Sequence, residues 1–100
     1  MKRDIVIAAT GELREHSQPK APTLDELQKL VGGFIQQVSH WTKHDGLKAD
    51  VWCDDDGKVN DKPFNRRATT MWYAALGQTV GDHLVGDVVI VTSVPKVKEA

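Results

Sequence analysis

Apolar and polar positions alternate along the chain with two different periods, one typical of strands and one of helices. Asp4–Thr10 is rich in β-branched residues, and Gly86–Val94 contains four consecutive apolar residues. Short apolar runs bounded by glycine or proline are typical of buried strands. The pattern therefore predicts a strand near each end of the chain, the second ending at Pro95 before a frayed tail.

A third strand is predicted over Leu47–Val59, where apolar and polar residues alternate. Alternation with a period of two indicates a strand with one buried face. Thr42–Gly46 is expected to be a turn before it. Asp56-Gly57 is expected to form a tight hairpin turn, with Lys58–Phe64 as a short partner strand. One face of the third strand carries Leu47, Ala49, Val51 and Cys53, and the other face carries Lys48, Asp50, Trp52 and Asp54.

Two segments follow the helical period. Pro22–Gly33 begins with Thr23 and Glu26, which form a capping box, and places its leucines on one face. Asn65–Gly77 begins with Asn65, a favourable N-cap, and ends at a glycine. The sequence therefore predicts two helices.

Two connections can be interpreted in more than one way. Gly11–Pro22 is polar and contains two prolines, so we expect a loop that could include an irregular edge strand. The first helix could continue through Gly32-Gly33, keeping its apolar period as far as Trp41. Alternatively, the glycines end the helix and Phe34–Trp41 is a strand. The second interpretation is favoured.

The resulting order of elements is strand, helix, three strands, helix, strand. We expect residues 1–100 to form a single α+β domain. Its sheet, mixed or antiparallel, would have about four to five strands, and the two helices would pack on it.

Composition narrows the classes of protein that remain. The chain has 100 residues and a net charge of −1, which argues against a general nucleic-acid binder. Its single cysteine forms no internal disulfide, so a reducing cytoplasm is the expected compartment. The first apolar run is too short for a signal peptide, and no run approaches the roughly 18 residues of a membrane span.

The best candidate site is the start of the second helix. The helix N-terminus after Asn65 presents free backbone amides, and Arg66 and Arg67 add donors that suit a phosphate or carboxylate. The competing interpretation is a capped helix with two solvated arginines. Trp52 and Trp72 are candidates for a partner surface or for stacking on a base. Trp52 would instead belong to the core if a helix covers its face of the sheet.

Other chemistry finds little support. The acidic segment Asp54–Gly57 lacks the spacing of a calcium loop, because Trp52 and Pro63 occupy ligand positions. His40 and His44 have helical spacing but no accompanying glutamate, so no zinc site is predicted. Cys53 lies on an apolar face and is interpreted as a buried structural cysteine. We therefore predict no catalytic residue, no metal and no cofactor, and a protein that is not an enzyme.

Four segments together resemble a family of small proteins of unknown function encoded by bacteriophages and other mobile elements. They are a T-L-x-x-L-Q-x-x-V-G-G segment, an acidic-Gly turn, an N-R-x-A segment and a closing G-D strand, spanning Thr23 to Val91. The resemblance implies that the helix breaks at the two glycines, and it implies a bacterial cytoplasmic setting. It supplies no catalytic residue.

Two hypotheses follow. The first is a small non-enzymatic accessory protein that binds a host protein, such as a defence factor, and inhibits or modulates it. The alternative is an oligomeric sponge that holds a phosphorylated nucleotide at Asn65, Arg66 and Arg67 and stacks its base on Trp52 or Trp72.

Overall fold

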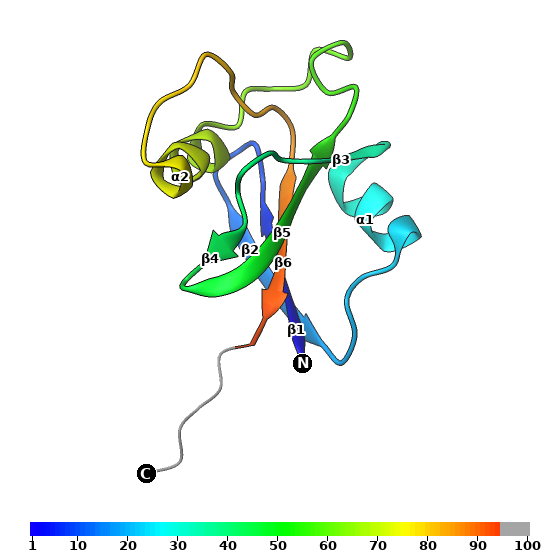
Figure 1. Ribbon diagram of the computed structural model, residues 1–100. Coiled ribbons are helices and arrows are strands. Elements are labelled where there is room, and N and C mark those ends of the chain that lie inside the picture. Colours follow the sequence, from blue (N-terminus) through cyan, green and yellow to red (C-terminus); the bar gives the residue numbers. More distant parts are fainter. Residues whose placement is uncertain (95–100) are drawn as a thin grey trace.

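An antiparallel sheet of six strands forms the middle layer of the molecule (Figure 1). The structure is a computed structural model, and it describes residues 1–94. Along the sheet the order is β2-β1-β6-β5-β3, and β4 pairs with β5. The predicted α+β class is confirmed, with six strands instead of four or five, and the predicted tail lies outside the described residues. The strands are β1 (Lys2–Ile7), β2 (Leu13–Gln18), β3 (Ile35–Gln37), β4 (Lys43–His44), β5 (Leu47–Asp54) and β6 (Val88–Ser93).

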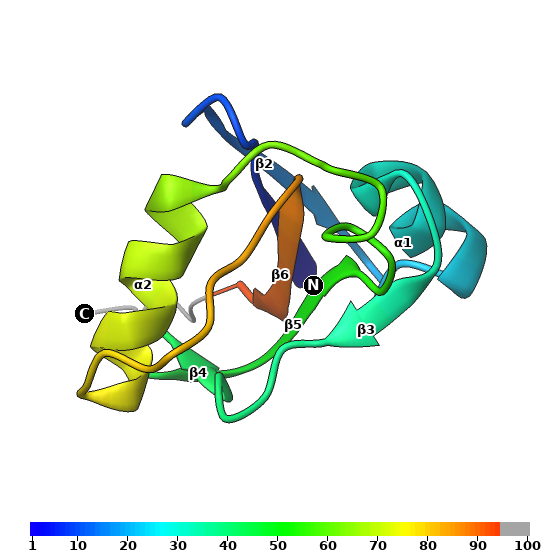
Figure 2. The ribbon, with the colours of Figure 1, turned by 90° about the horizontal axis from the view of Figure 1, so that it is seen from above.

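The two helices lie on opposite faces of this sheet (Figure 2). Helix α1 (Leu24–Val31) packs through Leu27 and Val31 on a cluster that contains Val6, Val89 and Val91. Helix α2 (Arg66–Leu76) packs on the other face. Neither helix described within residues 1–94 is long and apolar enough to cross a bilayer. The cluster under α2 contains Ala68 and Trp72 of the helix with Ile5, Ile7, Val51, Val88 and Ile90 of the sheet.

Strand β5 shows why both faces of the sheet are covered. Ala49 and Val51 are buried under α2, and Cys53 packs against the same cluster. Trp52, one position out of phase, packs against the cluster under α1. The alternation predicted from the sequence is therefore confirmed, and a helix does cover the face that carries Trp52.

The ends of α1 follow the local sequence. Thr23 accepts a hydrogen bond from the amide of Glu26, and Glu26 reaches back to the Thr23 amide, as a capping box requires. Gly32 ends the helix with φ of 79°, a left-handed conformation that glycine adopts without strain. The predicted break is confirmed, and β3 follows it.

Strand β2 is longer and more regular than expected. The sequence predicted a loop over Gly11–Pro22 that could include an irregular edge strand. Six residues of this segment pair regularly with β1, from Lys2 opposite Gln18 to Ile7 opposite Leu13. The strand lies at the outer edge of the sheet and is exposed along almost its whole length. An exposed edge strand buries neither face, so no apolar alternation marks it in the sequence.

The hairpin predicted at Asp56-Gly57 is wrong. Strand β5 is already paired by β6 and β3, so a further partner strand has no edge to join. Residues 55–61 form consecutive turns instead, and the amide of Lys62 donates to the carbonyl of Gly57 at 2.9 Å. The Asp-Gly hairpin turn occurs at Asp45 and Gly46, where β4 meets β5 and both residues have positive φ.

Candidate functional site

The candidate site is one end of the sheet, where β1 and β5 end and β2, β3 and β6 begin (Figure 1). We call this region the loop end and define it as residues 8–13, 32–34, 55–65 and 82–87. All four segments that carried the family resemblance contribute residues to it or next to it.

A buried ion pair joins three segments at the loop end. The Asp54 side chain, only 2% exposed, pairs with Lys62, and its Oδ1 accepts the amide of Asp56 at 2.8 Å. Lys62 Nζ also donates to the carbonyl oxygens of Val31 at 2.8 Å and Gly32 at 3.3 Å, which are left unpaired where α1 ends. Burial opposes ionisation of Asp54. The hydrogen bonds from Lys62 and Asp56 outweigh burial and hold its pKa below the ordinary value.

Two glycines leave room for this ion pair. A Cβ atom on Gly33 would lie 2.7 Å from Asp54 Oδ2. A Cβ atom on Gly86 would lie 2.9 Å from Lys62 Cδ, and Gly86 has φ of 69°. Such short contacts require the pair to move. Packing around Asp54 and Lys62 therefore explains why glycine occupies positions 33 and 86. These are the second glycine of the V-G-G segment and the glycine of the closing G-D.

Asn65 is fully buried and every polar atom of its side chain is used. Its Nδ2 donates to the carbonyls of Ile7 at 2.8 Å and Gly86 at 2.7 Å. Its Oδ1 accepts the amide of Ala68 at 2.9 Å, which caps α2 as predicted. The side chain therefore ties α2 to β1 and to the segment before β6, and it offers no free atom to a ligand.

Arg66 and Arg67 are the first two residues of α2 and follow the N-cap Asn65. Both residues are exposed, and Arg67 Nη1 donates to the carbonyl of Gly11 at 2.8 Å. They border a shallow hollow of about 460 Å³ whose lining residues include no carboxylate. The remaining lining residues are Ala9, Thr10, Gly11, Thr70 and Met71.

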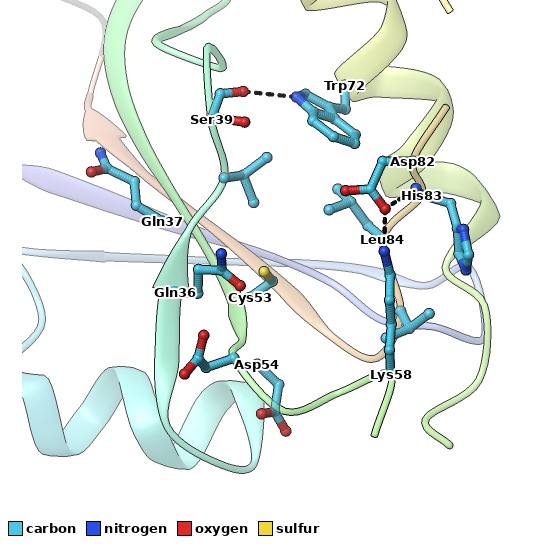
Figure 3. A pocket seen from close by; sticks show the side chains of 13 residues that line it. Gln36, Gln37, Ser39, Cys53, Asp54, Lys58, Trp72, Asp82, His83 and Leu84 are labelled. Atoms are coloured by element: carbon cyan, nitrogen blue, oxygen red, sulfur yellow. Dashed lines mark hydrogen bonds and ion pairs between the residues drawn. The ribbon is translucent and has the colours of Figure 1, made fainter. Parts of the chain in front are cut away.

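The two candidate tryptophans lie on opposite faces of the sheet. Trp72 is buried on the face of α2 that packs on the sheet, and its Nε1 donates to the carbonyl of Ser39 at 2.9 Å (Figure 3). Trp52 is half-buried on the α1 face. The structure therefore brings Arg66 and Arg67 together but separates Trp52 from them. Asn65 and Trp72 face the interior and contribute nothing to the exposed surface.

A small cleft of about 180 Å³ opens between β3 and the segment before β6 (Figure 3). Lys58 and Asp82 form an ion pair beside it, and the pairing, together with the His83 amide, lowers the pKa of Asp82. Cys53 lines the cleft, and burial, followed by the charges of Asp54 and Asp55, raises its pKa to about 11. The thiol is therefore protonated near neutral pH, which opposes a role as nucleophile.

Three large apolar side chains stand exposed at the loop end, and the sequence reasoning missed them. Phe34 is 70% exposed, Val59 82% and Phe64 51%. The Phe34 carbonyl accepts the Asp55 amide at 2.8 Å, and the Phe64 ring meets the His83 ring edge-on at 5.5 Å. The signal in the sequence is a large apolar residue within a connecting segment. No neighbouring apolar residues at helical or strand spacing predict that such a residue is buried.

Within residues 1–94, no three His, Cys, Asp or Glu side chains lie together in a way that could hold a metal ion. The loop end exposes Phe34, Val59 and Phe64, and Arg66 and Arg67 of α2 lie directly after it in the chain.

These features define a small α+β protein whose loops are fixed by buried polar contacts at one end of the sheet. A family model described as Domain of unknown function (DUF3846) matches residues 1–99, and the chain belongs to this family. No curated protein matches the chain. No solved structure matches it either.

Proposed function

We propose that the protein is a small, non-enzymatic accessory protein of a bacteriophage or other mobile element. It acts in the bacterial cytoplasm by binding a host protein, and it inhibits or modulates that protein, with defence factors as the target class. The observation that carries this proposal is the exposure of Phe34, Val59 and Phe64 at the loop end. The mobile-element setting rests on the four sequence segments that resemble such proteins.

Exposed aromatic and aliphatic side chains on a fixed backbone favour protein binding. Burying them against a partner removes apolar surface from water, which stabilises a complex. The backbone that presents them is held by the Asp54–Lys62 pair and by Asn65, so little conformational entropy is lost on binding. The raised pKa of Cys53 supports a binding role over thiol catalysis.

The proposal is tested by affinity purification of the tagged protein from bacterial lysate, followed by native mass spectrometry. We expect a host protein to co-purify at a fixed stoichiometry. The double substitution Phe34→Ser and Val59→Ser should abolish co-purification while the thermal unfolding temperature stays unchanged, because both side chains are exposed.

Leu24→Ser is the matched control. Leu24 is also exposed but begins α1 and lies outside the loop end, which α1 reaches only at its C-terminal cap Gly32. Co-purification should survive this substitution. A partner that is retained by the double variant, or lost equally with Leu24→Ser, would contradict binding through the loop end.

A second candidate function is the nucleotide sponge, favoured by the hollow that Arg66 and Arg67 border without a carboxylate. Neither candidate tryptophan can stack on the base of a nucleotide bound at this hollow, because Trp72 is buried and Trp52 lies on the other face of the sheet. Native mass spectrometry distinguishes this candidate. The sponge would be favoured over the protein-binding role if the protein is an oligomer that carries a mass excess of a few hundred daltons, and if this excess disappears in Arg66→Ala.

A further inference from the structure

A second hollow lies on the α1 face of the sheet, away from Arg66 and Arg67. Its volume is about 400 Å³, within the usual size range of small-molecule sites. Helix α1 forms one wall, and strands β1 and β2 form the other. The lining residues are Asp4, Val6, Arg14, Glu15, His16, Glu26, Lys29 and Leu30.

One oxygen of a buried carboxylate in this lining lacks a hydrogen-bond partner. Asp4 is only 4% exposed, and its Oδ2 accepts a hydrogen bond from Gln18 Nε2 at 2.8 Å. Its Oδ1 is buried and has no hydrogen-bond partner among the described residues. Burial is the main reason that the pKa of Asp4 is raised. A buried polar atom without a partner is rare in folded proteins and points to a group that is absent from the chain itself.

A second carboxylate acts on Asp4 from α1. The charge of Glu26 contributes to raising the Asp4 pKa, whereas His16 of β2 acts in the opposite direction. Glu26 Oε1 is occupied by the amide and hydroxyl of Thr23 in the capping box. Among residues 1–94, neither Arg14 nor Lys29 forms an ion pair with Asp4 or Glu26. A cation between the two carboxylates would relieve their repulsion and supply the missing donor.

The rest of the hollow suits an apolar body. Val6 is buried, Leu30 is half-buried, and both line the space beside Asp4. We propose that this hollow binds a small organic cation, a primary amine carried on an apolar body, with the ammonium between Asp4 and Glu26 and the body against Val6 and Leu30. Protein binding through the loop end neither requires nor excludes this site.

Titration of ¹⁵N-labelled full-length protein with 2-phenylethylamine tests the proposal, with 2-phenylethanol as the uncharged probe of the same shape. We expect saturable shifts of the Asp4, Val6, Lys29 and Leu30 amides. The alcohol should bind at least about tenfold more weakly, because it lacks the charge-assisted hydrogen bonds. Equal affinity for the two probes, or no saturable shift at these amides up to about 10 mM amine, would overturn the proposal.

Variants identify the carboxylates. Asp4→Asn and Glu26→Gln should each weaken amine binding by roughly tenfold, and glutamine preserves the capping box. Asp25→Asn removes the same charge from the preceding position of α1, and Asp25 does not line the hollow, so this substitution should leave the affinity unchanged. The thermal transition of the Asp4→Asn variant shows whether it is folded. If the folded variant binds the amine as tightly as wild type, the amine binds at another surface and the proposal is wrong.

Discussion

At the scale of single residues, Lys62 is the side chain on which the loop end depends most. It neutralises Asp54 and also donates to the carbonyl oxygens of Val31 and Gly32. One ammonium group thereby satisfies a buried acid and completes the end of a helix. A lysine in a turn-rich acidic segment gives no local hint of this role, because its partners are distant in the chain.

Lys62→Met should destabilise the fold by roughly 3–5 kcal/mol, because it leaves the Asp54 carboxylate buried without its counter-charge. Urea unfolding followed by tryptophan fluorescence measures the effect. Adding Asp54→Asn to this variant should recover part of the loss, since it removes the uncompensated charge.

Lys58→Met is the control for that substitution. Lys58 also pairs with an aspartate, Asp82, but both side chains are about half exposed. Its removal should cost less than about 1 kcal/mol. If the Lys62 variant were no less stable than the Lys58 variant, the buried pair would not be holding the loop end.

At the scale of elements, the N-terminus of α2 is joined to the sheet through Asn65. Helix propensity and capping explain why a helix starts there, but they do not position it. The two hydrogen bonds from Asn65 Nδ2 to Ile7 and Gly86 fix the helix against β1 and the start of β6. Arg66 and Arg67 are therefore presented from a rigid base.

Asn65→Asp should destabilise the protein by roughly 3 kcal/mol or more near neutral pH. The aspartate keeps the acceptor that caps α2, but it loses both donors and places a charge against two carbonyl oxygens. Urea unfolding measures the loss. Asn60→Asp, the same change at an exposed position, should have little effect, and equal losses in the two variants would contradict the structural role of Asn65.

The same residue shows what the sequence could and could not predict. Local signals identified the Asn65 cap, the Thr23 capping box and the alternation of Val51 and Trp52, because each depends on neighbours in the chain. The ties from Asn65 to Ile7 and the Asp54–Lys62 pair depend on residues brought together only by folding. For the same reason, the sequence suggested Asn65 as a ligand contact, although its side chain is fully used in hydrogen bonds to Ile7, Gly86 and Ala68.

At the scale of the whole molecule, three carboxyl groups give opposing dependences of stability on pH. Asp54 and Asp82 have lowered pKa values in the folded state, because hydrogen bonds to lysines favour their charged forms. They add stability above the ordinary carboxyl pKa, and this stability is lost as the pH falls through their folded pKa values. Asp4 has a raised pKa, chiefly through burial, so its ionisation weakens the fold above that pKa.

Asp4→Asn should therefore make the protein more stable than wild type near neutral pH, since asparagine carries no charge to bury and can still accept the hydrogen bond from Gln18. The advantage should vanish as the pH falls below the ordinary carboxyl value, where Asp4 is protonated in both folded and unfolded chains. Unfolding free energies at about pH 7 and about pH 3 measure the difference. Asp61→Asn, at an exposed position, controls for the loss of one negative charge. A variant that is less stable than wild type at neutral pH would contradict a net cost of burying the Asp4 charge, and would instead make the attraction of His16 for that charge the dominant effect. Repeating the wild-type measurement at about pH 7 with the amine probe present connects the pH profile to the hollow beneath α1, because a ligand that binds the charged form should raise the stability of wild type and not that of the Asp4→Asn variant.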